Sequence, residues 1–384
     1  MNFSWTQEQL TFQQQIADFA QQELATPNLI DRDRSGTFPN DLWQRCADFG
    51  ILGLTIPKKY GGYFEELDIM KAVLAMESIG YHCRDNGFVL ALNAQLWTVQ
   101  LPIVKFGSEE QRKDLLPRLA SGEKICVHAL TEPEVGSDVF AMQMRAEKTD
   151  GGYILNGKKH LITLGPLSDV AMVLASTNPK MGNWGISAFL VEKGTSGFEI
   201  GEVHEKMGMR TVPFGELTFK DCFVPKSSLL GRAGSGFSIL NHSLEYDRSC
   251  AYASVVGTLQ RQLEENIAFA KKRTQFGQTI GKFQSVANRI VDMKTRLEMA
   301  RLLLYKSAWL TSQGKSAMLE AAMVKLQLSE AFLAGSIDTV RNFGGIGYKT
   351  ETHVERDVRD AMGGVLYAGT SDIQRNIIAK LLGL

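Results

Sequence analysis

The segment from Gln284 onward carries a heptad pattern of apolar residues that restricts the fold more than any other feature. Its members alternate in steps of four and three residues: Val286, Ile290, Met293, Leu297, Ala300 and Leu304. Such spacing places one apolar stripe along a helix and is typical of a helix inside a bundle. A second stripe, with Glu330 in one of its places, comprises Leu319, Met323, Leu326, Leu333, Ile337 and Val340. The sequence therefore predicts long packed helices in the C-terminal part.

The spacing of apolar residues changes from helical to alternating near Lys124. Short apolar or alternating runs bounded by turn residues predict strands at 153–155, 170–175, 186–191 and 216–219. Helical spacing prevails before this stretch, and Thr6 with Gln9 has the pattern of a capping box. We expect an α+β multidomain fold, with a helical domain over 1–123, a β-barrel or sandwich domain over 124–235 and a helical bundle over 236–384.

Composition excludes several classes of protein. Lys plus Arg and Asp plus Glu balance at 42 each, so no overall field favours nucleic acid or an anionic membrane. The five cysteines are scattered without a CxxC pair and the six histidines show no metal spacing, which favours reduced thiols and no metal site. The start lacks a secretion signal, and no apolar run reaches membrane-spanning length. We expect a cytoplasmic protein without membrane insertion.

Residues 343–374 combine a glycine cluster with a predicted helix start. Gly344 and Gly345 let backbone N–H groups come close to a ligand. Thr370 and Ser371, followed by Asp372, have the pattern of an N-capped helix, whose unpaired N–H donors favour a negative group. We expect the chemistry to converge on this stretch.

Five motifs occur in order along the chain: TEPEVGSD at 131–138, GKKHLIT at 157–163, RTQFG at 273–277, FGGIG at 343–347 and GTSDIQ at 369–374. Each alone is a weak signal and could be a simple turn or helix end. Together they resemble the acyl-CoA dehydrogenase superfamily, and this resemblance implies a helical, β and four-helix-bundle architecture. It also implies a tightly bound FAD. Residues 80–87 and 101–106 resemble the subgroup that oxidises aminoacyl or hydroxyacyl groups on carrier proteins, such as prolyl-carrier-protein dehydrogenases.

The resemblance assigns FAD-binding roles residue by residue. It places the 131–137 loop and Thr163 at the flavin, although Leu161 replaces the aromatic residue that is usual there. Arg273 and Phe276 match a segment that reaches the FAD of a neighbouring subunit, which implies a homotetramer or at least a dimer. The residues implied to bind FAD are Leu130, Thr131, Gly136, Ser137, Leu161, Thr163, Arg273, Phe276, Gln284, Arg341, Gly344, Gly345, Thr370 and Asp372.

The implied reaction removes a proton from Cα of a thioester while a hydride leaves Cβ, so it needs a carboxylate base. The family's usual carboxylate precedes the Gly-Thr-Ser motif, where this chain has Ala368. Some members place the base on a bundle helix before an arginine, which here matches Asp247 followed by Arg248, with Glu245 as the reserve candidate. The Ala368 backbone N–H would still donate to the thioester oxygen. A structural ion pair of Asp247 with Arg248 or with another charge of the bundle is the alternative.

The resemblance thus implies an FAD-dependent dehydrogenase of a carrier-protein-bound thioester, with an electron-transfer flavoprotein or oxygen as electron acceptor. A short- or branched-chain acyl-CoA dehydrogenase is the second hypothesis. A flavin oxidase or monooxygenase on the same fold is the third. A flavin-free scaffold, which Ala368 would favour, is the fourth.

Overall fold

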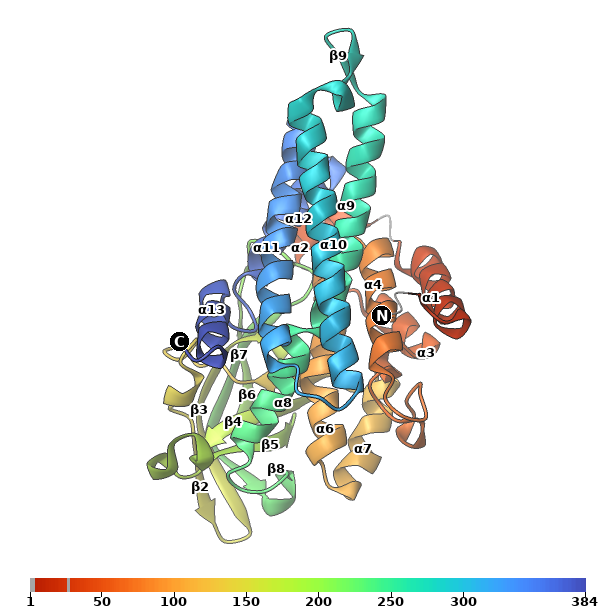
Figure 1. The fold of residues 1–384 in the computed structure, drawn as a ribbon. Helices are drawn as coiled ribbons and strands as arrows, with labels where there is room; N and C mark the ends of the chain where they lie inside the picture. The colour runs from red at the N-terminus through yellow and green to blue at the C-terminus, as the bar shows by residue number, and fades with distance from the viewer. Residues whose placement is uncertain (1–3, 26–27) are drawn as a thin grey trace.

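The N-terminal part of the chain is helical (Figure 1). The computed structural model describes residues 4–25 and 28–384. The capping box predicted at Thr6 is confirmed, because its side chain accepts from the Gln9 N–H and the Gln9 side chain accepts from the Thr6 N–H. The helices are α1 (Gln7–Phe19), α2 (Leu29–Ser35), α3 (Asn40–Phe49), α4 (Ile69–His82), α5 (Asn86–Asn93), α6 (Leu101–Phe106) and α7 (Glu109–Ala120).

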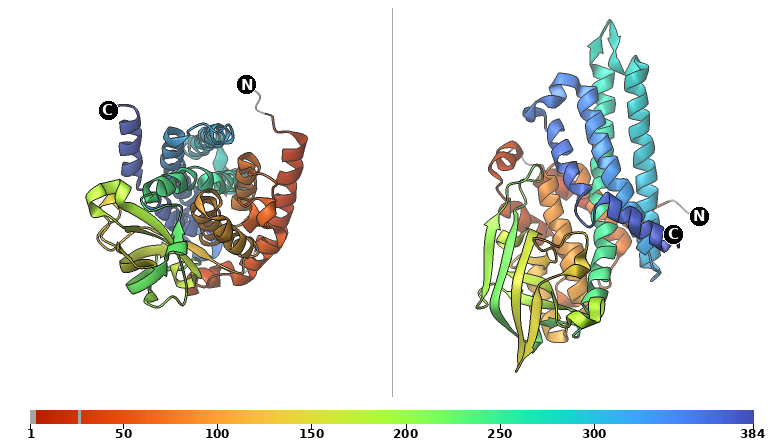
Figure 2. Two further views of the ribbon diagram at one scale, coloured as in Figure 1. Left: turned by 90° about the horizontal axis from the view of Figure 1, so that it is seen from below. Right: turned by 90° about the vertical axis from the view of Figure 1, so that its left-hand side faces the viewer.

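The middle of the chain forms one sheet in the order β6-β7-β3-β2-β4-β5-β8, with β1 paired in parallel to β4. All four predicted strands are confirmed and lie within longer strands. Figure 2 shows this sheet against one side of the helical part. The strands are β1 (Cys126–Ala129), β2 (Arg145–Thr149), β3 (Gly152–Thr163), β4 (Val170–Ser176), β5 (Ile186–Glu192), β6 (Phe198–Val203), β7 (Phe214–Pro225) and β8 (Leu229–Leu230).

The C-terminal part is a bundle of long helices, so the predicted fold class is confirmed. Helices α9, α10 and α11 pack along one another, and α4 of the N-terminal part packs against α9 and α10. A small hairpin joins α9 to α10 at the far end of the bundle (Figure 1). The elements are α8 (Gly236–Arg248), α9 (Ala253–Lys272), β9 (Thr274–Gln275), β10 (Gln278–Thr279), α10 (Gln284–Ser312), α11 (Met318–Phe343), α12 (Val354–Gly364) and α13 (Ser371–Leu381).

Of the two predicted apolar stripes, the one in α10 is buried and the one in α11 is not. In α10 the stripe faces the core, where Met293 and Leu297 are buried. In α11 the predicted stripe is not the buried face, because Met323 is 38% exposed while Val324 and Leu328 are buried. Helix α11 packs against α8, α9, α10, α12 and α13, so its neighbours together cover a different face from the one that the heptad spacing marks.

The helical stretch Asn86–Phe106 is long and apolar enough to cross a membrane by length and composition alone, contrary to the expectation from the sequence. It joins α5 to α6 as one helical run, and 83% of its most apolar window is buried inside the fold. That burial is typical of a core helix of a soluble protein, whose apolar side chains face protein rather than lipid.

Candidate active site

Helix α8 presents Asp247 and Arg248 at its C-terminal end. Both side chains are half-buried. Burial raises the pKa of the Asp247 carboxyl to about 6, and the nearby positive charges of Arg248 and Lys325 oppose this rise. Burial lowers the pKa of Arg248, and Asp247 opposes that shift. A carboxyl with this pKa is mostly ionised at neutral pH and is a stronger base than an ordinary aspartate.

Arg248 links the end of α8 to the turn that carries Ala368. Its Nε donates a 3.2 Å hydrogen bond to the Ala368 carbonyl oxygen. The turn is held from its other side by Gln374, whose Nε2 donates to the carbonyl oxygens of Ala368 and Gly369 at 3.0 Å each. The segment that bears Asp247 and the turn at Ala368 are therefore neighbours.

Ala368 adopts a left-handed backbone conformation, with φ of 55°, and Gly369 follows with φ of 86°. This conformation is uncommon for a residue with a Cβ and marks a backbone that its surroundings hold in place. Within the described residues no hydrogen bond uses the Ala368 N–H. A fixed N–H that no acceptor of the described chain uses is a suitable donor to an oxygen that gains negative charge. Thr370 caps α13, as predicted, by accepting from the Ile373 N–H at 3.3 Å.

The reserve base, Glu245, is occupied elsewhere. Its Oε1 accepts a 3.0 Å hydrogen bond from the Ala317 N–H, just before α11 begins. Glu245 thus ties α8 to the start of α11. This contact favours Asp247 over Glu245 as the available carboxylate.

A buried ion pair fixes the loop 130–137. The Lys159 Nζ lies 2.9 Å from the Glu132 Oε1 and donates to the Leu130 carbonyl oxygen at 2.8 Å. Glu132 also accepts from the backbone N–H groups of Gln143 and Met144. Because Lys159 is fully buried, its pKa falls to about 8, although Glu132 opposes the shift. The Lys159 side chain therefore holds the loop against β3, while Gly136 and Ser137 of the loop are exposed.

An irregularity in β3 turns Leu161 outward. The register of β3 against β7 shifts between Lys159 and Ile162, and Leu161 there has φ of 57° and is 45% exposed. Such a bulge redirects a side chain out of the regular alternation of a strand. The His160 N–H donates to the Thr131 carbonyl oxygen at 2.8 Å, so β3 and the 130–137 loop are joined beside Leu161.

The hydroxyls on these two segments have no partner within the described part of the chain: Thr131, Ser137 and Thr163. Together with the exposed Leu161, they offer hydrogen-bonding groups and one apolar face on adjoining backbone. This set fits an isoalloxazine ring, which has polar atoms at its edge and an apolar face.

The other residues implied to bind FAD lie elsewhere in the fold. Arg273 and Phe276 belong to the hairpin at the far end of the bundle, and Phe276 is 93% exposed (Figure 1). Gln284 begins α10, Arg341 lies in the last turn of α11, and Gly344 and Gly345 follow that helix. All four residues are exposed. Within one chain the structure does not bring this group to Asp247. Asp372, which is also exposed, pairs with Arg375 at 2.9 Å.

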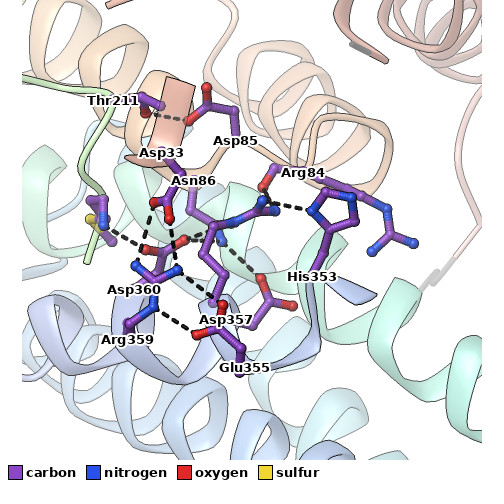
Figure 3. A network of polar contacts seen from close by, with 12 residues as sticks. Asp33, Arg84, Asp85, Asn86, Thr211, His353, Glu355, Asp357, Arg359 and Asp360 are labelled. Atoms are coloured by element: carbon purple, nitrogen blue, oxygen red, sulfur yellow. Dashed lines mark hydrogen bonds and ion pairs between the residues drawn. The ribbon is translucent and has the colours of Figure 1, made fainter. Parts of the chain in front are cut away.

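A polar network holds the helix that precedes the Ala368 turn (Figure 3). Asp360 of α12 accepts from the Met209 N–H and from Asn86 Nδ2. Arg359 pairs with Asp33 and Glu355, each at 2.7 Å. Arg359 and Asp360 lie within the stretch 343–374, where the sequence predicts the chemistry to converge. Their contacts join α12 to the N-terminal helices and to the loop before β7.

The structure gathers His160, His204 and Glu216, which the sequence spacing did not group. Their ligand atoms lie within 4.8 Å of one another. The His160 Nδ1 and Glu216 Oε1 are 2.9 Å apart, and Lys158 Nζ lies 4.0 Å from the same carboxylate. The positive charge of Lys158 at the Glu216 carboxylate disfavours binding of a metal cation there. The three side chains are therefore described best as a hydrogen-bonded cluster across the strands.

Sequence reasoning missed Lys325, a fully buried lysine of α11. The available signal was a lysine inside the apolar run AMVKLQL, three residues before Leu328. A charge on an apolar helical face calls for a partner or a role.

Comparisons with known proteins cover the whole chain. Three family models match: the N-terminal domain of acyl-CoA dehydrogenase at 6–123, the middle domain at 127–222 and the C-terminal domain at 234–383. The chain is 39% identical over 385 residues to L-prolyl-[peptidyl-carrier protein] dehydrogenase of Pseudomonas fluorescens, covering 100% of each. It is 36% identical to the short-chain specific acyl-CoA dehydrogenase of Megasphaera elsdenii, covering 97% of each.

Solved structures agree with these matches. The crystal structure of the prolyl acyl carrier protein oxidase AnaB is 43% identical with a TM-score of 0.97, over 99% of this chain and 100% of that one. The structure of PigA with FAD and proline is 38% identical with a TM-score of 0.97, over 100% of each chain. The chain therefore belongs to the acyl-CoA dehydrogenase family and is an FAD-dependent enzyme that dehydrogenates thioesters.

Proposed function

We propose that this enzyme oxidises the Cα–Cβ bond of an aminoacyl group, in the first place a prolyl group, carried as a thioester on a carrier protein. Two relatives that match the full chain bear names of prolyl-carrier-protein enzymes, which supports this substrate class. The single structural observation that carries the proposal is the half-buried carboxyl of Asp247 beside Arg248, which contacts the Ala368 turn.

Asp247 is the proposed base. Its carboxylate would accept the Cα proton of the thioester, and the electron pair of that C–H bond would stay on the substrate as enolate charge. The Ala368 N–H would donate to the thioester oxygen and stabilise this charge. FAD, when bound, supplies the acceptor for the hydride from Cβ.

The remaining residues hold the cofactor and exclude water. The hydroxyls of Thr131, Ser137 and Thr163 and the side chain of Leu161 would contact the flavin from the β-domain. Arg273, Phe276, Gln284, Arg341, Gly344 and Gly345 are proposed to serve the FAD of a neighbouring subunit in a dimer or tetramer. Their exposure, and the place of the α9–α10 hairpin at the far end of the bundle (Figure 1), support this division. Thr370 and Asp372 would lie near the phosphates.

Anaerobic titration tests the substrate. The purified enzyme is mixed with prolyl, other aminoacyl and acyl groups, each on a carrier protein and on CoA, while the flavin absorbance is followed. We expect bleaching by prolyl-carrier protein at a much lower concentration than by any CoA thioester. Equal or preferential bleaching by acyl-CoA would overturn the proposal and support a short- or branched-chain acyl-CoA dehydrogenase, which the 36% identity to the Megasphaera enzyme favours as second candidate.

The electron acceptor and the cell compartment belong to the same proposal. We infer that electrons pass to an electron-transfer flavoprotein or to oxygen, and that the enzyme acts in the cytoplasm. Reoxidation of the reduced enzyme in air, compared with reoxidation by an electron-transfer flavoprotein, separates the two acceptors. Fast reaction with oxygen alone would identify an oxidase.

A further inference from the structure

Lys325 is a buried cation without a hydrogen-bond partner. Its side chain is fully buried in α11, and its Nζ contacts no acceptor among the described residues. Burying an ammonium away from water is costly unless an opposite charge compensates it. A lysine retained at such a position therefore needs a negative group within electrostatic range.

Two carboxylates supply that charge. Burial lowers the pKa of Lys325 to about 8, and Glu330 and Asp247 oppose this shift, while Arg248 adds to it. Helix α8, whose last turn carries Asp247, packs directly on α11. Lys325 in turn opposes the rise that burial causes in the pKa of Asp247. Within the described residues no hydrogen bond joins the Lys325 Nζ to either carboxylate.

Arg248 and two tyrosines also lie within electrostatic range of Asp247. Arg248 is the adjacent cation, and its Nε is committed to the Ala368 carbonyl oxygen. Tyr252 and Tyr367 also lie within range of the Asp247 charge, but their pKa values are raised by burial, so both hydroxyls stay neutral. Tyr252 donates to the Gly364 carbonyl oxygen at 2.8 Å. Among these described groups, Lys325 is therefore the cation whose charged nitrogen makes no hydrogen bond.

We propose that Lys325 is a positioning residue for Asp247, whose ammonium acts across the contact between α8 and α11 to keep the carboxylate ionised and able to accept the substrate proton. This inference rests on the proposed role of Asp247 as base. It assigns to a lysine on a separate helix the role of offsetting the effect of burial on the Asp247 carboxylate. The ammonium itself does not touch the substrate.

The competing explanation is that Lys325 only neutralises Glu330 of its own helix. The two explanations differ in what the removal of each charge does. If Lys325 serves Asp247, its loss changes the ionisation of the base and the loss of Glu330 leaves that ionisation nearly unchanged. If Lys325 serves Glu330 alone, neither loss changes the base.

The experiment compares Lys325→Met, Lys325→Arg and Glu330→Gln. The rate of flavin reduction in a single anaerobic turnover is measured from pH 5 to pH 9 with the thioester that reduces the parent enzyme most readily. We expect Lys325→Met to raise the apparent pKa of the base by about 1, because a cation near a carboxylate lowers its pKa by about 1 or more. The Met variant should thus be about tenfold slower below both pKa values and near the parent rate at high pH. Lys325→Arg and Glu330→Gln should keep the parent profile.

A second readout needs no turnover. The carboxyl and carboxylate infrared bands of Asp247, identified by subtracting the spectrum of Asp247→Asn, are titrated in the resting FAD-loaded enzyme. The same rise in pKa should appear in Lys325→Met, and Lys325→Gln replaces it if the Met variant does not fold or retain FAD. Superimposable profiles for parent and Met or Gln variants, or an equal shift in Glu330→Gln, would overturn the inference. Unchanged bleaching in Asp247→Asn would instead refute the proposed function, so the two failures are distinguishable.

Discussion

The Nε of Arg248 and the carbonyl oxygen of Ala368 lie 3.2 Å apart, which joins the end of α8 to the turn before α13. This one bond brings the residue after the proposed base to the residue whose N–H is the proposed oxyanion donor. The carboxylate that the family usually has at this turn is absent from it, and a half-buried carboxyl stands on the helix that the turn contacts. The position of the base and the position of the oxyanion donor are therefore mechanically coupled.

Asp247→Asn tests the base. The amide is nearly isosteric but cannot accept the Cα proton, so we expect flavin bleaching to slow by roughly 10²–10⁴-fold while FAD stays bound. Stopped-flow absorbance measures the rate, and the visible spectrum after gel filtration measures FAD retention. Glu245→Gln is the matched control, because its carboxylate caps the start of α11. A slow Gln variant and a normal Asn variant would exchange the two assignments.

The ionisation of Asp247 predicts a pH profile. The rate of flavin reduction should rise with pH and level off above an apparent pKa near 6, because only the ionised carboxyl accepts a proton. A profile that is flat from pH 5 to pH 8 in single turnover would contradict a base with this pKa.

The same group predicts a linked effect on stability. The unfolded carboxyl ionises near pH 4, whereas the folded one ionises near pH 6, so the unfolded state binds fewer protons between these values. Ionisation of Asp247 thus lowers the free energy of unfolding as pH rises from about 4, and the decrease is complete above about pH 6. Asp247→Asn should be more stable than the parent above pH 6, and this gain should vanish below pH 4. Denaturant unfolding at both pH values measures it.

Arg248→Met should disturb both functions of the residue. Loss of the hydrogen bond to Ala368 loosens the turn that holds the N–H donor, and loss of the charge raises the pKa of Asp247. We expect a rate at least about tenfold lower at neutral pH and a pH profile moved to higher pH. Arg248→Lys should restore the pH profile but not the full rate, since a lysine lacks the fixed fork of the guanidinium. Full activity in the lysine variant would show that charge alone matters.

Lys159→Met tests the anchor under the 130–137 loop. The change leaves the Glu132 carboxylate buried without its cation, which typically costs about 3–5 kcal/mol of unfolding free energy. Denaturant unfolding of the FAD-free protein measures this cost. Lys158→Met is the matched control, because the Lys158 side chain is 56% exposed and should change stability by less than about 1 kcal/mol. Similar losses in both variants would contradict the assigned anchor.

Arg273→Ala tests the proposed contribution of one subunit to the FAD of another. The side chain is exposed in the described chain, so its removal should leave the fold unchanged and weaken FAD retention. Flavin content after dialysis, measured over a range of protein concentrations, reports the effect. Lys272→Ala removes a neighbouring exposed charge and should retain FAD as the parent does. Equal retention in both variants would argue against a role for Arg273.

Local patterns in the sequence identified much of the fold because they depend on neighbouring residues. The capping box at Thr6, the cap at Thr370, the four strands and the buried stripe of α10 all follow from spacing within a few turns or strand positions. The prediction of the buried face of α11 was wrong because several helices surround α11. The spacing of apolar residues within α11 does not specify where those helices lie.

The sequence by itself determined the order of helical and β segments, the family resemblance and the absence of a carboxylate at Ala368. Only the tertiary structure decided that Glu245 accepts from the start of α11, that Arg248 bonds the Ala368 carbonyl oxygen and that Lys325 is buried on a helix packed against α8. These contacts join residues far apart in the chain, and their geometry depends on how helices pack. The ionisation of a carboxyl depends in turn on burial and on charges brought close by that packing, which no local pattern of residues specifies.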